Sequence, residues 1–569
     1  MAHRTAALPR LVPRLYAPAL RCMPRYTTSS RTAAIAAHLN AMHTSATTFA
    51  SAPTPPPVDN PDAVVLARSD GVMRTLTLNR PRRINAIDAE VVHELTVHVR
   101  NIAESPNAAI ILVRGEGRGL SAGGDIMDVA LGMISEDPKE RIKPYLYFNR
   151  EFTLNYLIHT LEERTRATTG TKLYISLIDG ITMGGGVGIS VHAPFRVATE
   201  RTLFAVPETG IGYYPDVGVL HSYGRLDGGI GPYCTLTGAR LNGADTYLSG
   251  LATHFVPSNV LSDAVHRLSS LPLESAQRPE VVAEILNEYS ADPFSRETPE
   301  GAAALENSPF LGDRRAAIDA CFTHGRVEDI FMSLSYLARG NEQSEAARAL
   351  AAYGGKLTDT VKQFAADTLA TLDLKAPRAL KVTLEATRRA GHQRLDEVLR
   401  SNMRLTTLFC DVNLGRDFYN GVMHTLGRDP KTGKRRTGRA PWSPATIAEV
   451  DDDLIRTLCF GNIADAYRAG LQKIIPVEGL PEPVTDSKDR RARDAEMRGV
   501  GPLNWQPQHN RFALPSEAEL AALVEGSHPA AGSYVLEPNE LLEAIRNHKG
   551  NKPATTLKVE DWLARTRST

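Results

Sequence analysis

Short hydrophobic runs alternate with amphipathic stretches along the first part of the chain. Two alternating runs flank Asp70-Gly71, a pattern that predicts a β-hairpin. Residues 85–104 repeat hydrophobic side chains at helical spacing, and the apolar runs 107–115 and 172–180 are typical of buried strands. A long helical pattern fills most of the interval between those two strands. Strands that alternate with helices predict an α/β core with helices packed on a sheet.

The pattern continues with a helix start at 184–193 and a strand pair over 195–208, and it becomes helical from about residue 260. The helices predicted in this later part are 260–271, 279–289, 326–339, 360–372, 379–390 and 394–409. Beyond about residue 460, prolines separate short helical runs such as 516–526 and 538–549. The basic, turn-rich segment 428–441 is interpreted as a solvated surface insertion, with a contact to a partner or RNA as the alternative.

Composition and charge narrow the functional classes. The chain has 569 residues, more than one core usually organises, and its 42% hydrophobic and 23% charged residues are ordinary for a globular protein. Residues 1–58 contain six arginines and no Asp, Glu or Lys, a composition typical of a mitochondrial transit peptide. We expect a transit peptide over 1–45 and a proline-rich linker over 46–61. The rest of the chain is mildly acidic, which argues against nucleic-acid binding driven by global charge.

Neither cysteines nor long apolar runs indicate a metal site or a membrane span. The five cysteines lie far apart, and no Cys/His spacing indicates zinc, so we predict no metal and free buried thiols. No apolar run reaches the roughly 18–20 residues that a membrane-spanning helix needs, so no membrane association is expected.

Two glycine-rich loops carry the candidate chemistry. Residues 121–125 (SAGGD) and 183–188 (MGGGVG) each follow a predicted strand and precede a helix. Such turns expose backbone N–H groups that favour negative charge, and two of them converging on one oxygen form an oxyanion hole. The carboxylates of Glu208 and Asp216 follow in the next loop. Backbone donors with carboxylates indicate acyl chemistry on an activated carbonyl.

Competing interpretations of these glycines fit less well. The segment GGGVGIS matches neither the dinucleotide-binding pattern GxGxxG nor the P-loop. Residues 119–123 do match G-x-S-x-G, but a further loop separates Ser121 from the preceding strand, and no Asp/His pair is placed to activate it. A nucleophilic serine is therefore disfavoured.

Five segments in order resemble the crotonase (enoyl-CoA hydratase/isomerase) superfamily, and within it the mitochondrial 3-hydroxyisobutyryl-CoA hydrolases. They are NRPRRINAI (79–87), SAGGDI (121–126), DGITMGGGVGISVHAPFRVATE (179–200), FAVPETGIGYYPDVG (204–218) and LTGARLNGADTYLSGLATHFV (236–256). The resemblance implies an α/β crotonase-like ββα spiral core over 62–260, with two near-perpendicular sheets. It further implies a helical C-terminal region over 261–460, followed by an extension over 461–569.

The same resemblance implies roles for individual residues. The carbonyl oxygen of an acyl-CoA thioester would accept hydrogen bonds from the N–H groups of Gly124 and Gly185. Glu208 and Asp216 would be catalytic, and Glu151, Gly123 and Ala86 would join them in binding the substrate. Coenzyme A would be part of the substrate, so no separate cofactor is expected.

Two positions separate hydrolysis from hydration. Gly188 stands where hydratases of this superfamily carry a glutamate, and Asp216 stands where they carry a small residue. The sequence therefore favours a hydrolase. Three features depart from the family pattern: the long segment 161–174, the residues Val219 and Gly224, and the added basic loop 428–441 and tail after 460. Val219 lies three residues from Asp216, close enough to shift it.

The resemblance favours hydrolysis of 3-hydroxyisobutyryl-CoA in valine degradation, in the mitochondrial matrix. One alternative is a structural role in the mitochondrial small ribosomal subunit, since fungal relatives resemble such a protein. A third hypothesis is a hydratase or isomerase of the same fold. A homo-oligomer is also expected, because trimers are common in this superfamily.

Overall fold

The computed structural model describes residues 60–429, 432–483, 510–531 and 536–566. The expected transit peptide (1–45) and nearly all of the expected linker (46–61) lie outside these residues. All described residues belong to one compact unit, and their contacts cross the boundaries expected at 260 and 460.

A six-stranded sheet forms the base of the core, in the order β1-β2-β3-β4-β6-β9. β1 and β2 pair as the predicted antiparallel hairpin, and the other neighbours are parallel. The strands are β1 Val65–Asp70, β2 Met73–Leu78, β3 Ile110–Gly115, β4 Leu173–Ile178, β6 Phe195–Ala198 and β9 His254–Phe255. β4 is buried along its whole length, as expected for a parallel strand covered on both faces.

A second sheet of three short strands carries the glycine loops. Its order is β5-β7-β8, and the strands are β5 Ile181–Met183, β7 Leu203–Ala205 and β8 Leu241–Asn242. The strand pair predicted over 195–208 is therefore wrong as a pair, because β6 and β7 lie in different sheets. A turn in which Thr202 N–H donates to Thr199 O (3.1 Å) carries the chain from one sheet to the other.

Helices cover the core. α2 buries one face, from Val91 to Ile102, and begins at Asp88, whose side chain accepts from the N–H groups of Glu90 and Val91. The helices and 3-10 turns of this part are η1 Pro81–Arg83, α2 Ala89–Glu104, α3 Ile126–Ile134, α4 Pro138–Arg166, α5 Gly185–Val191, η2 Glu208–Ile211, α6 Leu220–Tyr223, α7 Ile230–Thr237 and α8 Gly243–Leu248.

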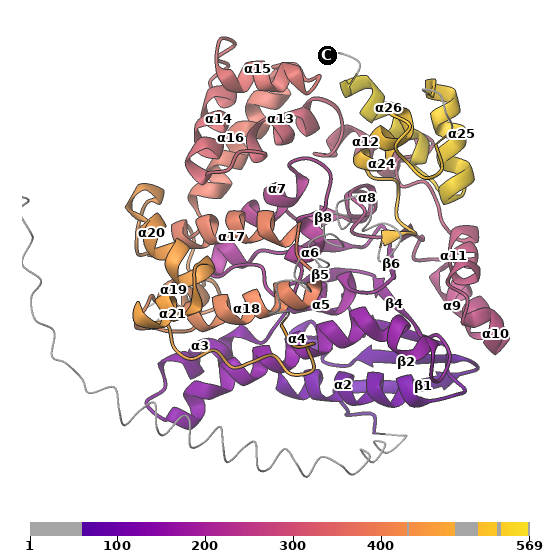
Figure 1. Cartoon of the computed structure of the whole chain (residues 1–569), viewed down its shortest axis with the longest axis horizontal. Helices are drawn as coiled ribbons and strands as arrows, with labels where there is room; N and C mark the ends of the chain where they lie inside the picture. Colours follow the sequence, from indigo (N-terminus) through magenta and orange to yellow (C-terminus); the bar gives the residue numbers. More distant parts are fainter. Residues whose placement is uncertain (1–59, 430–431, 484–509, 532–535, 567–569) are drawn as a thin grey trace, which may run out of the picture. The chain divides into compact units, whose positions relative to one another are not determined.

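The later part of the chain is helical, as predicted, and all eight helices predicted there are present. Its elements are α9 Leu261–Ser269, α10 Leu273–Ala276, α11 Pro279–Glu288, α12 Pro299–Asn307, α13 Gly312–Phe322, α14 Val327–Ala338, α15 Glu345–Ala352, α16 Asp359–Asp373, α17 Pro377–Ala390, α18 Leu395–Phe409, α19 Asp417–Thr425, η3 Ile447–Glu449, α20 Asp452–Ile455, η4 Arg456–Phe460, α21 Ile463–Arg468, α24 Glu517–Val524, α25 Pro538–Lys549 and α26 Thr555–Thr566. α18 packs against α4, and α17 packs against α7, so the helical region contacts the core directly (Figure 1).

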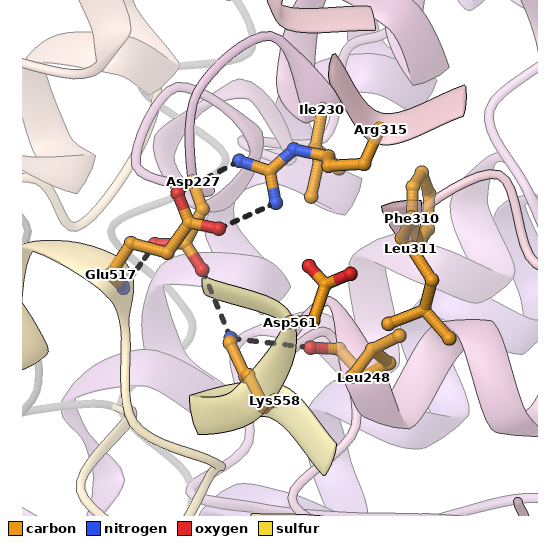
Figure 2. A pocket seen from close by; sticks show the side chains of 9 residues that line it. All are labelled: Asp227, Ile230, Leu248, Phe310, Leu311, Arg315, Glu517, Lys558 and Asp561. Atoms are coloured by element: carbon orange, nitrogen blue, oxygen red, sulfur yellow. Dashed lines mark hydrogen bonds and ion pairs between the residues drawn. The ribbon is translucent and has the colours of Figure 1, made fainter. Parts of the chain in front are cut away.

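Buried ion pairs hold the last helices against the core (Figure 2). Arg315 of α13 forms a two-pronged pair with Glu517 of α24, at 2.8 and 3.0 Å. Lys558 of α26 lies 2.9 Å from Asp227. A cleft with an empty volume of about 250 Å³ lies among these residues. Because its charged groups pair with one another, we attribute the cleft to the docking of the C-terminal helices and not to chemistry.

Two further predictions can be compared with the described residues. The four described cysteines are buried free thiols, as predicted. Among the described helices, none combines the length and the apolar character that crossing a bilayer requires.

Candidate active site

The two glycine-rich loops lie against each other. Ser121 pairs with Thr182 of β5, and Met183 N–H donates to Ser121 O at 2.9 Å. Gly123 has φ +103°, and a Cβ there would lie 3.1 Å from Met183 O and 3.6 Å from Gly185 N. A Cβ on Gly185 would lie 3.5 Å from Gly124 N. The positive φ of Gly123 and its close approach to Met183 O therefore favour glycine at this point between the two backbones.

One backbone donor of the first loop has no acceptor among the described residues. Between 121 and 126, the amides of the other residues donate to Ile181 O, Ile84 O, Ser121 Oγ, Ile87 O and Gly124 O. Only the N–H of Gly124 is left over. Gly185 is the first residue of α5, whose opening N–H groups have no acceptor within the helix. The loops thus bring together the two donors that the sequence predicted for an oxyanion hole.

Three carboxylates from three elements surround these donors. Glu151 lies on α4, Glu208 opens η2, and Asp216 follows in the next turn; they are 2%, 7% and 5% exposed. A side chain at Gly185 would collide with Glu151 Oε1, and a Cβ on Gly184 would lie 3.3 Å from Glu208 Oε1. Both glutamates therefore face the triple glycine.

The carboxylates hold protons more tightly than exposed acids do. Burial raises the pKa of Glu151 and of Glu208 well above the usual range, and the charge of Asp216 raises both further. Among the residues that the structure describes, Glu151 Oε1 and Glu208 Oε2 find no hydrogen-bond partner. Burial also raises the pKa of Asp216, to about 7, against the opposing effect of the Tyr213 hydroxyl, which lies 3.2 Å from its Oδ2. Such a cluster shares protons near neutral pH and suits general acid–base work.

A strained turn presents Asp216. Val217 has φ +47°, a conformation that costs a β-branched residue energy, and Gly218 has φ +71°. Val219, whose N–H donates to Asp216 O at 3.0 Å, is fully buried and precedes α6. The departure at Val219 is thus a core contact that closes the turn.

The other two departures from the family pattern in this part, segment 161–174 and Gly224, lie away from the three carboxylates. Residue 161 is ten residues from Glu151 on α4, about 15 Å along the helix axis. A side chain at Gly224 would meet Thr387 O of α17 at 2.5 Å, so this position now requires glycine. Neither feature contacts the carboxylate cluster.

The glycine at 188 also has a structural consequence. A Cβ there would lie 2.7 Å from Val217 Cβ, closer than side chains approach without movement. No acidic side chain fits at 188 while the 216–218 turn keeps its position. The residue at 188 and the turn that carries Asp216 are therefore in direct steric contact.

The remaining predicted residue, Ala86, lies beside the first loop. It is half-buried and precedes Ile87, whose N–H donates to Gly123 O at 2.8 Å. All residues of the predicted site are thus close to the paired loops. Their roles in binding and catalysis stay predictions.

Four further side chains reach this region that the sequence did not single out: Tyr147, His192, Tyr213 and Lys375. Tyr147 donates to Ile87 O at 3.0 Å, and a Cβ on Gly124 would lie 2.8 Å from its hydroxyl oxygen. Burial and then the charge of Arg240 lower the pKa of Lys375 to about 8, and the charge of Glu208 opposes the shift. Tyr147 could have been found from its spacing, because it lies one helical turn before Glu151 on α4.

One group of described residues elsewhere has the composition of a metal site: Glu519, His528 and His548. The N–H of Ala530 donates to His528 Nδ1 at 3.0 Å, so a neutral His528 carries its hydrogen on Nε2, the atom that faces Glu519. The ammonium of Lys549 lies 3.5 Å from Glu519 Oε1 and supplies a positive charge there. These contacts fit an ionic cluster better than a cation site.

Known proteins resemble this chain in sequence. The family model described as enoyl-CoA hydratase/isomerase matches residues 73–459. The small ribosomal subunit protein mS47 of Neurospora crassa is 29% identical over 508 residues, 87% of this chain and 85% of that protein. The mitochondrial 3-hydroxyisobutyryl-CoA hydrolase of Xenopus laevis is 32% identical over 406 residues, 71% of this chain and 90% of that protein. The human protein of the same name is 32% identical over 390 residues, which is 68% of this chain and 86% of that protein.

Solved structures resemble it in fold. A carnitinyl-CoA dehydratase from Mycobacterium thermoresistibile superposes with a TM-score of 0.53 at 28% identity, over 73% of this chain and 99% of that chain. An enoyl-CoA hydratase from Rhodobacter sphaeroides superposes with a TM-score of 0.52 at 25% identity, over 72% of this chain and 100% of that chain. The predicted α/β crotonase fold is confirmed.

Proposed function

Since the chain belongs to the enoyl-CoA hydratase/isomerase (crotonase) family, we propose that it hydrolyses a short-chain hydroxyacyl-CoA thioester, with 3-hydroxyisobutyryl-CoA as the substrate. The observation that carries this proposal is the set of three buried carboxylates facing two backbone donors at the paired glycine loops. The names of the hydrolases that match most of the chain support the choice of substrate. Coenzyme A enters as part of that substrate.

The proposed chemistry uses these groups in sequence. The thioester carbonyl oxygen accepts from the N–H groups of Gly124 and Gly185, which stabilise the oxyanion as the tetrahedral intermediate forms. Glu208 either removes a proton from the attacking water or attacks the carbonyl carbon itself to form a mixed anhydride that water cleaves. The carbon–sulfur bond breaks, the sulfur takes a proton, and the hydroxy acid and free CoA leave. Asp216 and Glu151 orient the water or the substrate hydroxyl.

Hydration of a double bond fits the site less well. That reaction in this family uses a second glutamate after the triple glycine, and the contact between Gly188 and Val217 leaves no room for one. The free thiol released by hydrolysis and the double bond changed by a hydratase are measured separately, so one assay pair separates the two reactions.

The variants Glu208→Gln and Asp216→Asn test the proposal. They keep the shape of each side chain but remove its proton transfer, so thiol release from 3-hydroxyisobutyryl-CoA should fall by about 10²-fold or more. The matched control is Glu163→Gln, which changes an exposed carboxylate of α4, the same helix as Glu151. Full activity in both site variants, with the fold intact, would overturn the assignment.

We propose as a second function a place in the mitochondrial small ribosomal subunit. The match to mS47 spans 508 residues, against 406 for the Xenopus hydrolase, so it extends over more of this chain. Segment 428–441 offers a contact of suitable charge. Arg428 and Arg435 of this segment form an antiparallel β-bridge, and Lys434, Arg435 and Arg436 are exposed. Among the described residues, no carboxylate pairs with these three cations.

Co-sedimentation with small ribosomal subunits tests this second function. Wild-type protein should sediment with the subunits and dissociate as salt rises, because contacts to phosphate release counterions. The variant Lys434→Glu/Arg435→Glu/Arg436→Glu should bind less, whereas Lys139→Glu/Lys143→Glu on α4 serves as the charge control. Absence of wild-type co-sedimentation at low salt would refute it. A mitochondrial location, in the matrix, is proposed with either function; the names of the relatives and the arginine-rich residues 1–58 support it.

A further inference from the structure

Helix α5 connects two parts of the candidate site. Its first residue, Gly185, is a proposed oxyanion donor, and the residue that ends it is His192. His192 Nε2 lies 2.7 Å from the carbonyl oxygen of Val217, the residue directly after Asp216. A carbonyl oxygen can only accept, so His192 Nε2 carries a hydrogen and donates it. One short helix thus contacts the oxyanion donor at one end and the acid-bearing turn at the other.

The turn that His192 contacts contains a residue with an unfavourable backbone conformation. Val217 adopts φ +47°, where its branched Cβ crowds the backbone. Two other hydrogen bonds close the turn: Val219 N–H donates to Asp216 O at 3.0 Å, and Gly218 N–H donates to Asn402 Oδ1 at 2.9 Å. The bond from His192 is the one made by the strained residue itself.

His192 is suited to act as a fixed donor. It is 1% exposed, and burial lowers its pKa to about 3, so the ring is neutral at physiological pH. The charged or titratable groups near it are His159, at 6.3 Å between ring centroids, and Arg196, and each lowers the pKa further. A Cβ on Gly218 would approach the His192 ring at 3.1 Å, which shows how closely the ring packs on the turn.

We propose that His192 is a positioning residue for Asp216. Its Nε2–H holds Val217 in the left-handed conformation and thereby keeps the Asp216 carboxylate beside Glu151 and Glu208. The role in turnover rests on the proposed thioester hydrolysis. The role in positioning is a property of the fold and can be measured without turnover.

Three variants test the proposal by activity. His192→Leu removes the donor and should lower kcat for thiol release at least tenfold, with KM changed less than twofold. His192→Gln places an amide N–H₂ near the position of Nε2 and should recover most of the loss. The double variant His192→Leu/Val217→Gly should also recover activity, because glycine adopts φ +47° without strain. The control is His98→Leu, a buried histidine of α2 away from the turn.

Crystal structures of wild type and His192→Leu give the second measurement. We expect Val217 to relax to negative φ and the Asp216 carboxylate to move in the Leu variant, but not in the Gln variant. An unmoved turn in the Leu variant would overturn the positioning role, whatever the activity. If His192→Leu does not fold, failure of Val217→Gly to restore folding in the double variant would overturn it. A wild-type protein that releases no thiol would refute the proposed function alone, since the two structures still decide the positioning role.

Discussion

At the scale of single residues, burial and neighbouring charges determine the protonation of the three carboxylates in the candidate site. Three buried carboxylates influence one another here, and the charge of Lys375 favours the ionised form of Glu208. Such a site cannot carry three full negative charges in a medium of low polarity. Burial therefore raises the pKa of all three acids, that of Asp216 to about 7, and favours the protonated form of part of the cluster.

The variant Tyr213→Phe should move the pH profile of hydrolysis. The Tyr213 hydroxyl donates to Asp216 and favours its charged form, so its removal should raise the pKa of Asp216 above about 7. If hydrolysis needs Asp216 ionised, kcat/KM rises with pH through that pKa, and the midpoint of the rise moves to higher pH in the variant. Thiol release measured from pH 5 to 9 gives both midpoints. An unchanged midpoint would exclude Asp216 as the titrating group.

The variant Glu151→Gln should stabilise the protein while it impairs the reaction. The pKa of Glu151 is higher in the folded than in the unfolded chain, so its contribution to stability is full below about pH 4.5 and is lost as the pH rises through the folded pKa. A neutral amide avoids this loss. We expect the melting temperature to rise on the order of 2 °C at pH 8 and the gain to shrink toward pH 5. Thermal unfolding at the two pH values measures it; a lower melting temperature at pH 8 contradicts the argument.

At the scale of elements, the hydrophobic pattern predicted most helices and strands and one strand pairing, the β1–β2 hairpin, but not the partners of the other strands. The hairpin at Asp70-Gly71 and a helix within 85–104 follow from local periodicity. The structure contains the hairpin, and the helix begins four residues later than predicted, at Ala89. The separation of β6 and β7 into two sheets could not be predicted, because a turn at Thr199–Thr202 decides it and the local pattern is the same for either arrangement. The glycine loops were found because backbone donors and carboxylates have a sequence signature. His192 has no such sequence signature, because the role proposed for it depends on its hydrogen bond to Val217, 25 residues later in the chain.

Helix α5 and the Asp216 turn should tolerate no added volume between them. In Gly188→Ala the new methyl group would meet Val217 Cβ at 2.7 Å, so either α5 or the turn must move. We expect a loss of about 1–3 kcal/mol in the free energy of unfolding, together with a lower kcat. Urea unfolding and thiol release measure the two effects. The compensating variant Gly188→Ala/Val217→Gly lacks the Val217 Cβ and Cγ2 that the methyl group would meet, so Gly188→Ala should cost less stability in the Val217→Gly background than in the wild type. An equal cost in both backgrounds would show that the contact is not responsible.

At the scale of the whole described unit, the C-terminal helices belong to the same structure as the core. Their attachment could not be predicted from sequence, because ion pairs such as Arg315–Glu517 join residues that are far apart along the chain and individually ordinary. The resemblance to known hydrolases is weakest in this same part. The C-terminal helices, which lie beyond the residues that match the family, are thus joined to the core by buried ion pairs such as Lys558–Asp227.

The pair Arg315–Glu517 should contribute measurably to this attachment. Glu517→Gln leaves the 3% exposed Arg315 side chain with Asp319 as its remaining acidic partner, so we expect a loss of about 2–3 kcal/mol in the free energy of unfolding. The control Lys362→Met breaks an exposed pair with Asp359 and should cost less than about 1 kcal/mol. Urea unfolding gives both values, and limited proteolysis should cut the Glu517 variant first near α24. Equal stability of the two variants would contradict the role of the pair.

The guanidinium of Arg196 bears on the order in which this protein can mature. It is fully buried in the core and donates to the carbonyls of Ala193, Gly250 and Leu251. It also bonds the side chain of Asn510, which lies 314 residues later in the chain. A chain emerging from a ribosome exposes Arg196 long before Asn510 exists. One hydrogen-bond partner of the buried Arg196 cation is therefore missing until nearly all of the chain has been synthesised. A product truncated before 510 should depend on chaperones that bind unfinished chains.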